Sequence, residues 1–579
     1  MKIRLTQFSM DLDYTEESLR QAVGLKLGVV ESAMLSCTVV RRSIDARRLR
    51  GPVCFMLAVE VELPEPSGAA TPAAWQNMTG IEIVPDSPPP ALAAIQAAPS
   101  RPPLPHPPVV VGAGPAGLLA AWRLAEDGLQ PILIDRGAPV QERHRTVARF
   151  WSQGLLDGED NVLFGEGGAG LYSDGKLTTQ SKLRGPMRTV LELLVQCGAD
   201  ASILIDAEPH LGSDRLAQIV PNLRERILAK GGQVRFHSRL EGLELDSGQL
   251  TALIVNGQRV ATRHCLLATG HSARDVYQML HRAGVALTPK PFAVGVRIEA
   301  PQPQIDESQF GPSAGHRRLG AAGFRLTRRP QGRARACYSF CMCPGGQVIA
   351  CASSPGMLTT NGMSLSPRSS GYGNAAFLVP IEPGDFGGSA AEPLAGIAWQ
   401  GQIEAKAFQA GGSDFSLPAC TLPDFLARRT PQSLPQERPP LRAAAADLHA
   451  ALPDCVSRTL VEAVPPMMRH MRQVAVERCL VYGAETRSSS PVRIPRDDSF
   501  QSPSARGLYP VGEGAGHAGG IVSSAIDGLR AAESLVAGRD GPRSGDCTDL
   551  QGAARRTREG TGKGRMRGPA RGCEHMQEY

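Results

Sequence analysis

The sequence predicts an α/β protein built around a Rossmann-type nucleotide-binding domain. Three observations support this prediction. A glycine-rich turn joins the β-branched run Val109–Val111 to a helix of small and apolar residues. Two further apolar strands, Cys265–Leu267 and Leu508–Val511, each run into a turn of small residues. A proline-rich segment precedes the first strand, so a short N-terminal unit is expected to fold apart from the main domain.

The composition is that of an ordinary globular protein. Hydrophobic residues make up 42% of the 579 residues, which allows three or four structural units with buried cores. The net charge of +6 is small for this length, and much of the positive excess stands beyond position 538. A broad nucleic-acid surface is therefore not expected.

The cysteines and the apolar stretches predict a cytoplasmic protein. Thirteen cysteines are spread along the chain without a C-x-x-C pair, which favours a reducing compartment over a disulfide framework. No run of about 18 apolar residues is present, so no membrane-spanning helix is expected. The N-terminus lacks the apolar core of a signal peptide.

The N-terminal segment is typical of a small α/β domain over residues 1–83. Its first residues alternate like a strand, Thr15 is suited to cap a helix, and residues 34–40 and 53–61 are typical of strands. This unit is either a docking or regulatory module or a packing appendage, and the pattern favours the appendage. Residues 84–108 are rich in proline and predict a stiff linker without a helix or a central strand.

Each glycine of the turn has its own role in binding a dinucleotide. Gly112 permits the tight turn after the strand, Gly114 lets the backbone approach a pyrophosphate, and Gly117 lets the helix pack on the strand. The N–H groups and the dipole at the helix start then meet the phosphates. Asp135 follows the next strand, 23 residues after Gly112, where an acid accepts ribose hydroxyls. The alternative is a glycine turn with a purely structural role.

Two features after this turn favour FAD over NAD. The loop Phe164–Lys176 is dense in glycine, so its backbone can pass close to a planar ring or a phosphate. The strand Cys265–Leu267 runs into Ala268–Gly270, which resembles the return to the cofactor in large flavoproteins of the glutathione-reductase type.

A third feature near the C-terminus also favours FAD. A strand ends at Gly512, and Glu513 is then placed to accept a ribityl hydroxyl. A helix is expected from about residue 520 to 535, and its positive end would stabilise an anionic reduced flavin. The residues predicted to bind FAD are therefore Gly112, Gly114, Pro115, Ala116, Gly117, Asp135, Arg136, Gly167, Gly168, Lys176, Ala268, Thr269, Gly270, Gly512, Glu513, Gly519, Gly520 and Ile521.

The order of these motifs resembles the two-dinucleotide-binding-domain flavoprotein superfamily. The segments Cys341–Val348, Asn361–Ser364 and Glu485–Arg493 resemble more closely a bacterial family of uncharacterised FAD-dependent dehydrogenases. The resemblance spans roughly residues 1–538 and implies an NAD(P)/FAD-dependent oxidoreductase with a glutathione-reductase-type FAD fold, but it supplies no substrate. His517 stands where the family usually has tyrosine, and Cys420 stands where it usually has glutamine, so specificity is expected to differ if these residues touch substrate.

The motifs divide the chain into a series of predicted parts. These are a small N-terminal α/β domain (1–83), a linker (84–108), the first part of the FAD-binding domain (109–279), an inserted α+β substrate or cap domain (280–470), the C-terminal part of the FAD-binding domain (471–538) and a disordered basic tail (539–579). The tail either has no function or contacts RNA, and the first interpretation is favoured.

Three residues are candidates for catalysis. The guanidinium groups of Arg487 and Arg368 suit a carboxylate substrate, although each could instead pair with an acidic neighbour. His517 follows the last strand and could donate a proton at the flavin edge, or it could simply pack. Lys176 could hold a phosphate or an anionic substrate. Cys341 and Cys343 form a C-x-C pair that could relay electrons, but buried inert thiols are favoured and a four-ligand zinc site is not expected.

The predicted function is an FAD-dependent oxidoreductase that transfers hydride between the flavin and a small, anionic organic substrate. No second G-x-G-x-x-G unit is found, so electrons are expected from transiently bound NAD(P)H or from a protein donor. The alternative is an FAD-binding protein that acts in RNA modification or as a docking or redox-sensing partner. If the protein is this oxidoreductase, neither a membrane nor a nucleic acid is expected as a partner.

Overall fold

A five-stranded parallel sheet forms the predicted nucleotide-binding domain. Its strand order is β23-β11-β5-β6-β7, and all neighbouring strands run parallel. The strands are β5 (Val109–Val111), β6 (Ile132–Ile134), β7 (Gln233–Arg235), β11 (Cys265–Leu267) and β23 (Leu508–Pro510). All but β7 are completely buried, as short apolar strands covered on both faces should be. The predicted Rossmann-type fold is confirmed.

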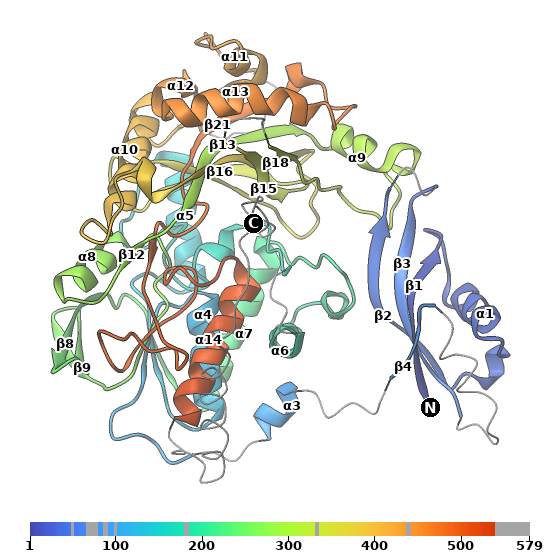
Figure 1. Ribbon diagram of the computed structural model, residues 1–579, viewed down its shortest axis with the longest axis horizontal. Helices are drawn as coiled ribbons and strands as arrows, with labels where there is room; N and C mark the ends of the chain where they lie inside the picture. The colour runs from blue at the N-terminus through green and yellow to red at the C-terminus, as the bar shows by residue number, and fades with distance from the viewer. Residues whose placement is uncertain are drawn as a thin grey trace, which may run out of the picture. The chain divides into compact units, whose positions relative to one another are not determined.

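The computed structural model describes residues 1–47, 51–64, 79–84, 91–97, 101–178, 184–329, 335–435 and 442–538 (Figure 1). The predicted tail, 539–579, lies outside the described residues. Within the described part, no helix is long and apolar enough to cross a membrane.

Helices cover the parallel sheet. Helix α4 (Pro115–Glu126) follows β5 directly and packs against β5, β6 and α7 (Ser213–Ala229). Helix α14 (Ile521–Ala537) follows β23, close to the predicted 520–535. The antiparallel strands β8 (Leu240–Asp246), β9 (Gln249–Val255) and β10 (Gln258–Ala261) form a separate three-stranded sheet before β11.

A seven-stranded sheet forms the inserted part. Its order is β14-β15-β18-β13-β21-β19-β20, antiparallel except between β19 and β20. The strands are β13 (Phe292–Pro301), β14 (Thr327–Arg328), β15 (Cys337–Cys343), β18 (Tyr372–Ile381), β19 (Leu417–Thr421), β20 (Ala443–Ala445) and β21 (Leu480–Glu485). Helix α13 (Asp454–Met468) packs across β13, β14, β15 and β18, as Figure 1 shows. The core of this part is therefore the space between α13 and the sheet.

One predicted domain boundary disagrees with the extent of this sheet. The sequence assigns residues from 471 onward to the FAD-binding domain, but β21 pairs with β13 and β19 of the inserted sheet. All six residues of β21 are buried, so this strand needs neighbours on both edges and both faces, which β13 and β19 supply. The inserted sheet therefore extends past the predicted boundary to Glu485.

The remaining elements connect these sheets. They are α5 (Val140–Gln153), α6 (Arg184–Gln196), α8 (Arg274–Arg282), α9 (Gln302–Phe310), α10 (Ala395–Ala410), α11 (Leu422–Leu426), α12 (Leu448–Ala451), η3 (Ala169–Tyr172), η4 (Ala201–Leu204), η5 (Gly311–Ser313), η6 (Pro383–Asp385), η7 (Val476–Arg478) and the strand pairs β12 (Thr288–Pro289) with β22 (Val492–Arg493) and β16 (Gln347–Cys351) with β17 (Thr359–Met363).

The N-terminal unit is a four-stranded antiparallel sheet with one long helix. The order is β2-β3-β1-β4, from β1 (Lys2–Met10), β2 (Ser36–Asp45), β3 (Cys54–Glu62) and β4 (Ile81–Val84), with α1 (Glu16–Leu27) and the short η1 (Glu31–Ala33). Thr15 and Ser18 form a capping box at the start of α1, so the predicted cap is confirmed. Arg42 of β2 pairs with Asp206 at 2.8 Å, and Arg318 donates to the carbonyl of Leu12. These contacts favour the packing interpretation of this unit.

The predicted linker contains a helix that the sequence interpretation excluded. Helix α3 (Ala91–Gln96) lies between the two proline clusters, and Gln96 donates to Gln196 of α6 at 2.9 Å. The prediction was wrong here because the six residues of α3 contain no proline and several good helix formers.

Candidate functional site

A cleft of about 280 Å³ opens where β5, β6, β11 and β23 end. This is the edge of a parallel α/β sheet at which ligands bind, at the point where the strand order reverses. The opposite wall comes from β15, β16, β17 and the segment after β21. That wall consists of Phe340, Cys341, Cys351, Thr359, Thr360, Asn361, Glu485, Arg487 and Ser488. The cleft is thus shared by the parallel sheet and the inserted part.

Most of the predicted cofactor-binding residues line this cleft. All do so except Gly117, Gly167 and Gly519. Gly117 has the packing role expected of it, because a Cβ there would lie 1.8 Å from the carbonyl oxygen of Gly112. Gly167 donates its N–H to Ala113 O at 2.8 Å and so ties the glycine-rich loop to the turn. Gly519 is exposed.

The turn after β5 is shaped to admit a phosphate group. Gly112 has φ +104°, and a Cβ there would lie 2.4 Å from Ala268 O, so no other residue fits. Gly114, by contrast, has only the Cα of Gly168 near its missing Cβ, at 3.7 Å. No side chain caps the first turn of α4, so its N–H groups are left for a ligand in the cleft. The residues therefore fit the pyrophosphate of a dinucleotide.

Asp135 and Arg136 line the end of the cleft beyond the turn. The Asp135 carboxylate accepts the N–H groups of Ala113 at 2.7 Å and Gly137 at 2.9 Å, so it also holds the turn against β6. The Arg136 guanidinium forms an ion pair with Asp275 and stacks on the Phe164 ring at 4.7 Å. This end suits the adenosine half of a dinucleotide.

A buried arginine shapes the glycine-rich loop. Arg143 of α5 is completely buried, and its guanidinium donates to five backbone carbonyl groups of the loop. These carbonyls belong to Asn161, Val162, Gly165, Glu166 and Gly168. This role is not visible in the sequence, because an arginine on an amphipathic helix normally faces solvent.

An Arg143→Met variant is expected to bind FAD about 10- to 100-fold more weakly, although Arg143 does not line the cleft. Hydrogen bonds from a charged donor are worth about 1.5–3 kcal/mol, and their loss frees the loop that carries Gly168. FAD titration followed by fluorescence would measure the change. Arg145→Met removes the same charge from an exposed position of α5 and should have no effect. Equal affinities for both variants would show that Arg143 does not shape the site.

Glu513 and His271 face each other at the far end of the cleft. Their side chains approach to 3.9 Å, and both residues line the cleft. Burial raises the pKa of Glu513 to about 7. Burial, with the positive charges of Arg487 and Arg274, lowers the pKa of His271 to about 3. The Nδ1 atom of His271 is buried and has no hydrogen-bond partner among the described residues, so a ligand in the cleft is its natural partner.

Arg487 lines the cleft but also forms a buried ion pair. Its Nε and Nη2 atoms donate to the two oxygens of Glu404 at 2.9 and 2.8 Å. Arg274 donates to the same two oxygens at 2.8 and 2.9 Å. Glu404 lies on α10 and is completely buried. Both interpretations of Arg487 from the sequence therefore apply. It pairs with an acidic neighbour, and it also stands in the cleft where a ligand would bind.

The other two catalytic candidates lie outside the lining of the cleft. Arg368 pairs with the buried Asp174 at 2.5 Å, because a buried carboxylate needs a cationic partner. Lys176 also pairs with Asp174, at 2.9 Å, but does line the cleft. His517 bonds the carbonyl of Ile494 at 3.0 Å. The structure thus favours the structural alternative for Arg368 and the packing alternative for His517.

The sequence does not single out His271 as a cleft residue, and it favours a buried, inert thiol for Cys341. A signal existed for His271, which directly follows the Ala268–Gly270 return at the carboxyl end of a parallel strand. Among the described residues, no group of histidine, cysteine and acidic side chains is arranged to hold a metal ion.

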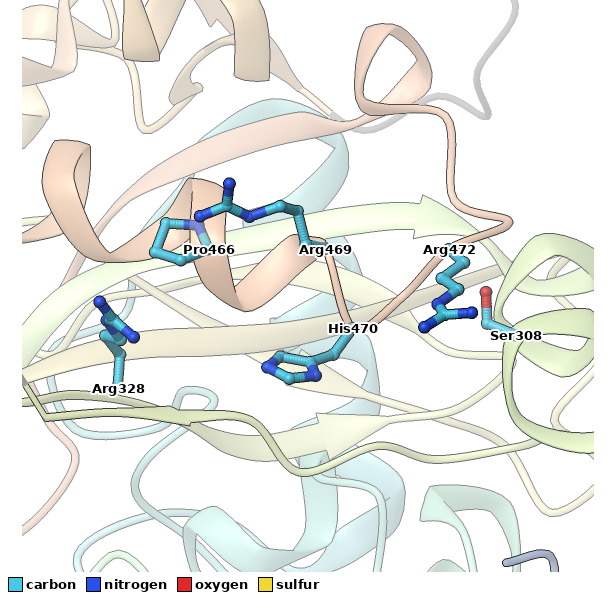
Figure 2. Close-up of a pocket in the computed structure, with 6 residues that line it drawn as sticks. All are labelled: Ser308, Arg328, Pro466, Arg469, His470 and Arg472. Atoms are coloured by element: carbon cyan, nitrogen blue, oxygen red, sulfur yellow. The ribbon is translucent and has the colours of Figure 1, made fainter. Parts of the chain in front are cut away.

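A second pocket, of about 530 Å³, has a different character (Figure 2). Figure 2 shows Arg469, His470 and Arg472 on the segment after α13, with Arg328 of β14 beside them. Cations are favourable after the C-terminus of a helix, which accounts for part of this cluster. The residues described as lining this pocket include neither a glycine-rich turn nor a helix N-terminus of the kind that binds a pyrophosphate.

Comparison with known proteins gives matches along most of the chain. Residues 108–166 match the FAD binding domain model, and residues 291–488 match the model of the C-terminal domain of FAD-dependent proteins. Residues 2–62 match a domain of unknown function. An uncharacterised protein of Clostridium beijerinckii is 38% identical over 545 residues, which cover 94% of this chain and all of that protein.

Solved structures show only distant likeness. An L-amino acid deaminase from Proteus vulgaris is 11% identical with a TM-score of 0.31, over 78% of this chain and 95% of that one. A geranylgeranyl bacteriochlorophyll reductase-like protein from Thermoplasma acidophilum is 13% identical with a TM-score of 0.33, over 75% and 79%. The assignment rests on the sequence matches and on the glycine turn. This chain binds FAD and belongs to the family of FAD-dependent oxidoreductases that includes the Clostridium beijerinckii protein.

Proposed function

We propose that this oxidoreductase transfers hydride between FAD and a small anionic organic substrate that binds beside Arg487. The supporting observation is the charge of the cleft wall. Two guanidinium groups, those of Arg487 and Arg274, share the single carboxylate of Glu404. The cluster therefore keeps one positive charge, and a buried positive charge favours an anion next to it.

The pKa of His271, which also lines the cleft, is lowered by burial and by the same positive charges. After burial itself, the neighbouring cations Arg487, Arg274 and Lys290 lower its pKa to about 3, so its ring stays neutral at physiological pH. A neutral imidazole can donate or accept a hydrogen bond without repelling an anion.

Each group at this end then has a distinct role. FAD, when bound, supplies the hydride-accepting N5 atom. Arg487 uses three of its five N–H groups on Glu404 and Ser353, which leaves two for a carboxylate or phosphate of the substrate. Glu513 has a pKa of about 7 through burial, so it can hold or release a proton at neutral pH beside His271.

A stopped-flow screen of flavin reduction tests this proposal. Carboxylic and hydroxy acids would be compared with their neutral methyl esters, and with NADH and NADPH, by the loss of flavin absorbance. Reduction by an acid but not by its ester supports an anionic substrate. Reduction by a nicotinamide alone would make the protein a reductase with another acceptor and would overturn the proposed substrate class.

An Arg487→Met variant is expected to lower kcat/KM for the acid found in this screen by roughly 10- to 100-fold. The loss reflects a charge-assisted hydrogen bond worth about 1.5–3 kcal/mol. Arg274→Met removes the same positive charge from the cluster but no donor that lines the cleft, so it should lower kcat/KM less than Arg487→Met does. Equal losses in the two variants would show that the charge of the cluster binds the anion and that the N–H groups of Arg487 do not.

The predicted cytoplasmic location also remains part of this proposal. All the cysteines in the described part of the chain are free thiols, which suits a reducing compartment.

A further inference from the structure

Cys341 and Cys343 are brought together by a bulge in β15. The pairing of β15 with β18 shifts between Phe340 and Cys343, and Cys341 has a φ of +43°. Neighbouring residues at i and i+2 of a regular strand lie about 6.6–6.8 Å apart, near the upper limit for a disulfide. A bulge bends and twists the strand locally, so the two side chains do not follow the geometry of a regular strand. The thiol of Cys343 donates to the Cys341 carbonyl oxygen at 3.4 Å.

Two cations stand next to this pair. Lys176 donates to the carbonyl of Met342, between the two cysteines. The buried Arg297 donates to the Cys341 carbonyl at 3.2 Å and lies 4.0 Å from the sulfur of Cys343. The hydrogen bond from Cys343, followed by Lys176 and Arg297, lowers the pKa of Cys341, against the effects of burial and of Glu485. The same pairing raises the pKa of Cys343. These opposite directions favour a thiolate at Cys341 and a thiol at Cys343.

The pair borders the FAD cleft. Cys341 lines the cleft, whereas Cys343 is completely buried. The charge of Cys341 contributes to the raised pKa of Glu513, so the sulfur stands within electrostatic reach of the flavin end of the cleft. Cys351 also lines the cleft, but burial raises its pKa to about 12. Of these two cleft cysteines, only Cys341 is suited to react as a thiolate.

We propose that Cys341 and Cys343 are a redox-active dithiol that exchanges electrons with FAD and, through Cys341, with a thiol–disulfide compound outside. This inference rests on the FAD-dependent activity and supplies the second half-reaction that the proposed function leaves open. The Cys341 thiolate and the Cys343 thiol form an S–S bond and lose two electrons and one proton. FAD, when bound, would supply the acceptor for both electrons and the proton. In the reverse direction an external disulfide accepts the electrons by thiol exchange at Cys341.

The first test measures the reactivity of each cysteine in the holoenzyme. Iodoacetamide labelling from pH 5 to pH 9, mapped by mass spectrometry, should modify Cys341 at pH 7 at least about ten times faster than Cys351. Lys176→Met should shift the labelling profile of Cys341 to higher pH while Cys351 stays unchanged. Equal labelling of Cys341 and Cys351 at pH 7 would overturn the proposal.

The second test detects the disulfide bond between Cys341 and Cys343. Holoenzyme equilibrated anaerobically with mixtures of reduced and oxidised glutathione should lose two hydrogen atoms from the peptide that carries both cysteines. Cys341→Ser and Cys343→Ser should each abolish that loss. Anaerobic dithiothreitol should reduce the flavin at least about tenfold faster in the wild type than in Cys341→Ser, because the thiolate is the reacting group.

The outcomes separate this inference from the proposed function. Two free thiols at every glutathione ratio would overturn the dithiol, whatever the flavin does. If Cys341→Ser still binds FAD and is still reduced by the organic acid, the anionic-substrate proposal survives that result. If the disulfide forms but no acid reduces the flavin, the dithiol stands and the proposed substrate class fails.

Discussion

A Gly114→Val variant is expected to fold normally and to bind FAD at least about 100-fold more weakly than the wild type. Gly114 has φ −80° and ψ −177°, an extended conformation that valine adopts without strain. Its missing Cβ has only the Cα of Gly168 nearby, at 3.7 Å, so the protein itself has room for a side chain. That room belongs to the cleft, where a valine would push the pyrophosphate off the N-terminus of α4. Steric misfit of about 1–3 kcal/mol, with lost phosphate hydrogen bonds of about 1.5–3 kcal/mol each, gives the expected factor.

The measurement is the FAD content and the melting temperature of the purified protein. Gly117→Ala provides the contrast, because its Cβ would meet the Gly112 carbonyl oxygen at 1.8 Å inside the protein. That variant should lose stability, whereas Gly114→Val should lose FAD and keep the melting temperature of the apoprotein. A Gly114→Val protein that is purified with stoichiometric FAD would contradict the placement of the pyrophosphate.

The elements that the sequence predicted best are those whose signal is local. The β5 strand, its glycine turn and α4 are contiguous, so the eighteen residues 109–126 carry both the fold and the nucleotide site. The capping box at Thr15 and the return at Ala268–Gly270 are equally local. The place of β21 was not predictable in this way, because its pairing with β13 joins residues nearly 200 positions apart. A buried apolar strand carries no sign of which sheet it joins.

The site shows the same division between local and distant information. Arg487 was selected from its own segment, but its partner Glu404 lies 83 positions earlier on a helix with no motif. Whether an arginine clamps a ligand or neutralises a buried acid depends on that partner. Cys341 likewise looked inert because the sequence does not show that Lys176 and Arg297 stand beside it. The type of a residue shows which reactions its side chain could take part in. Its contacts with distant parts of the chain determine whether it can do so.

A Glu404→Gln variant is expected to be about 3–5 kcal/mol less stable than the wild type at pH 7. Glu404 accepts four hydrogen bonds from Arg487 and Arg274 and a fifth from Thr486 at 2.8 Å. Glutamine keeps the shape but leaves two buried guanidinium groups without a counter-charge, and breaking such a buried pair costs about this much. Thermal or urea unfolding would measure the loss. Glu392→Gln makes the same change at an exposed position near the start of α10 and should alter stability by less than about 0.5 kcal/mol.

The difference between wild type and Glu404→Gln should also depend on pH, with a defined sign. Burial opposes ionisation, yet Arg487 and Arg274 lower the pKa of Glu404 to about 2, from an ordinary value near 4.5. A lowered pKa stabilises the folded state above the ordinary value, and this stability is lost as the pH falls from about 4.5 towards 2. At about 1.4 kcal/mol per pKa unit, the contribution is about 3 kcal/mol. The variant has no carboxylate to protonate at this position. The difference in the free energy of unfolding between the two proteins should therefore be largest at pH 7 and should decrease steadily below pH 4.5. A gap at pH 3 as large as that at pH 7 would show that the lost stability comes from shape rather than from the charge of Glu404.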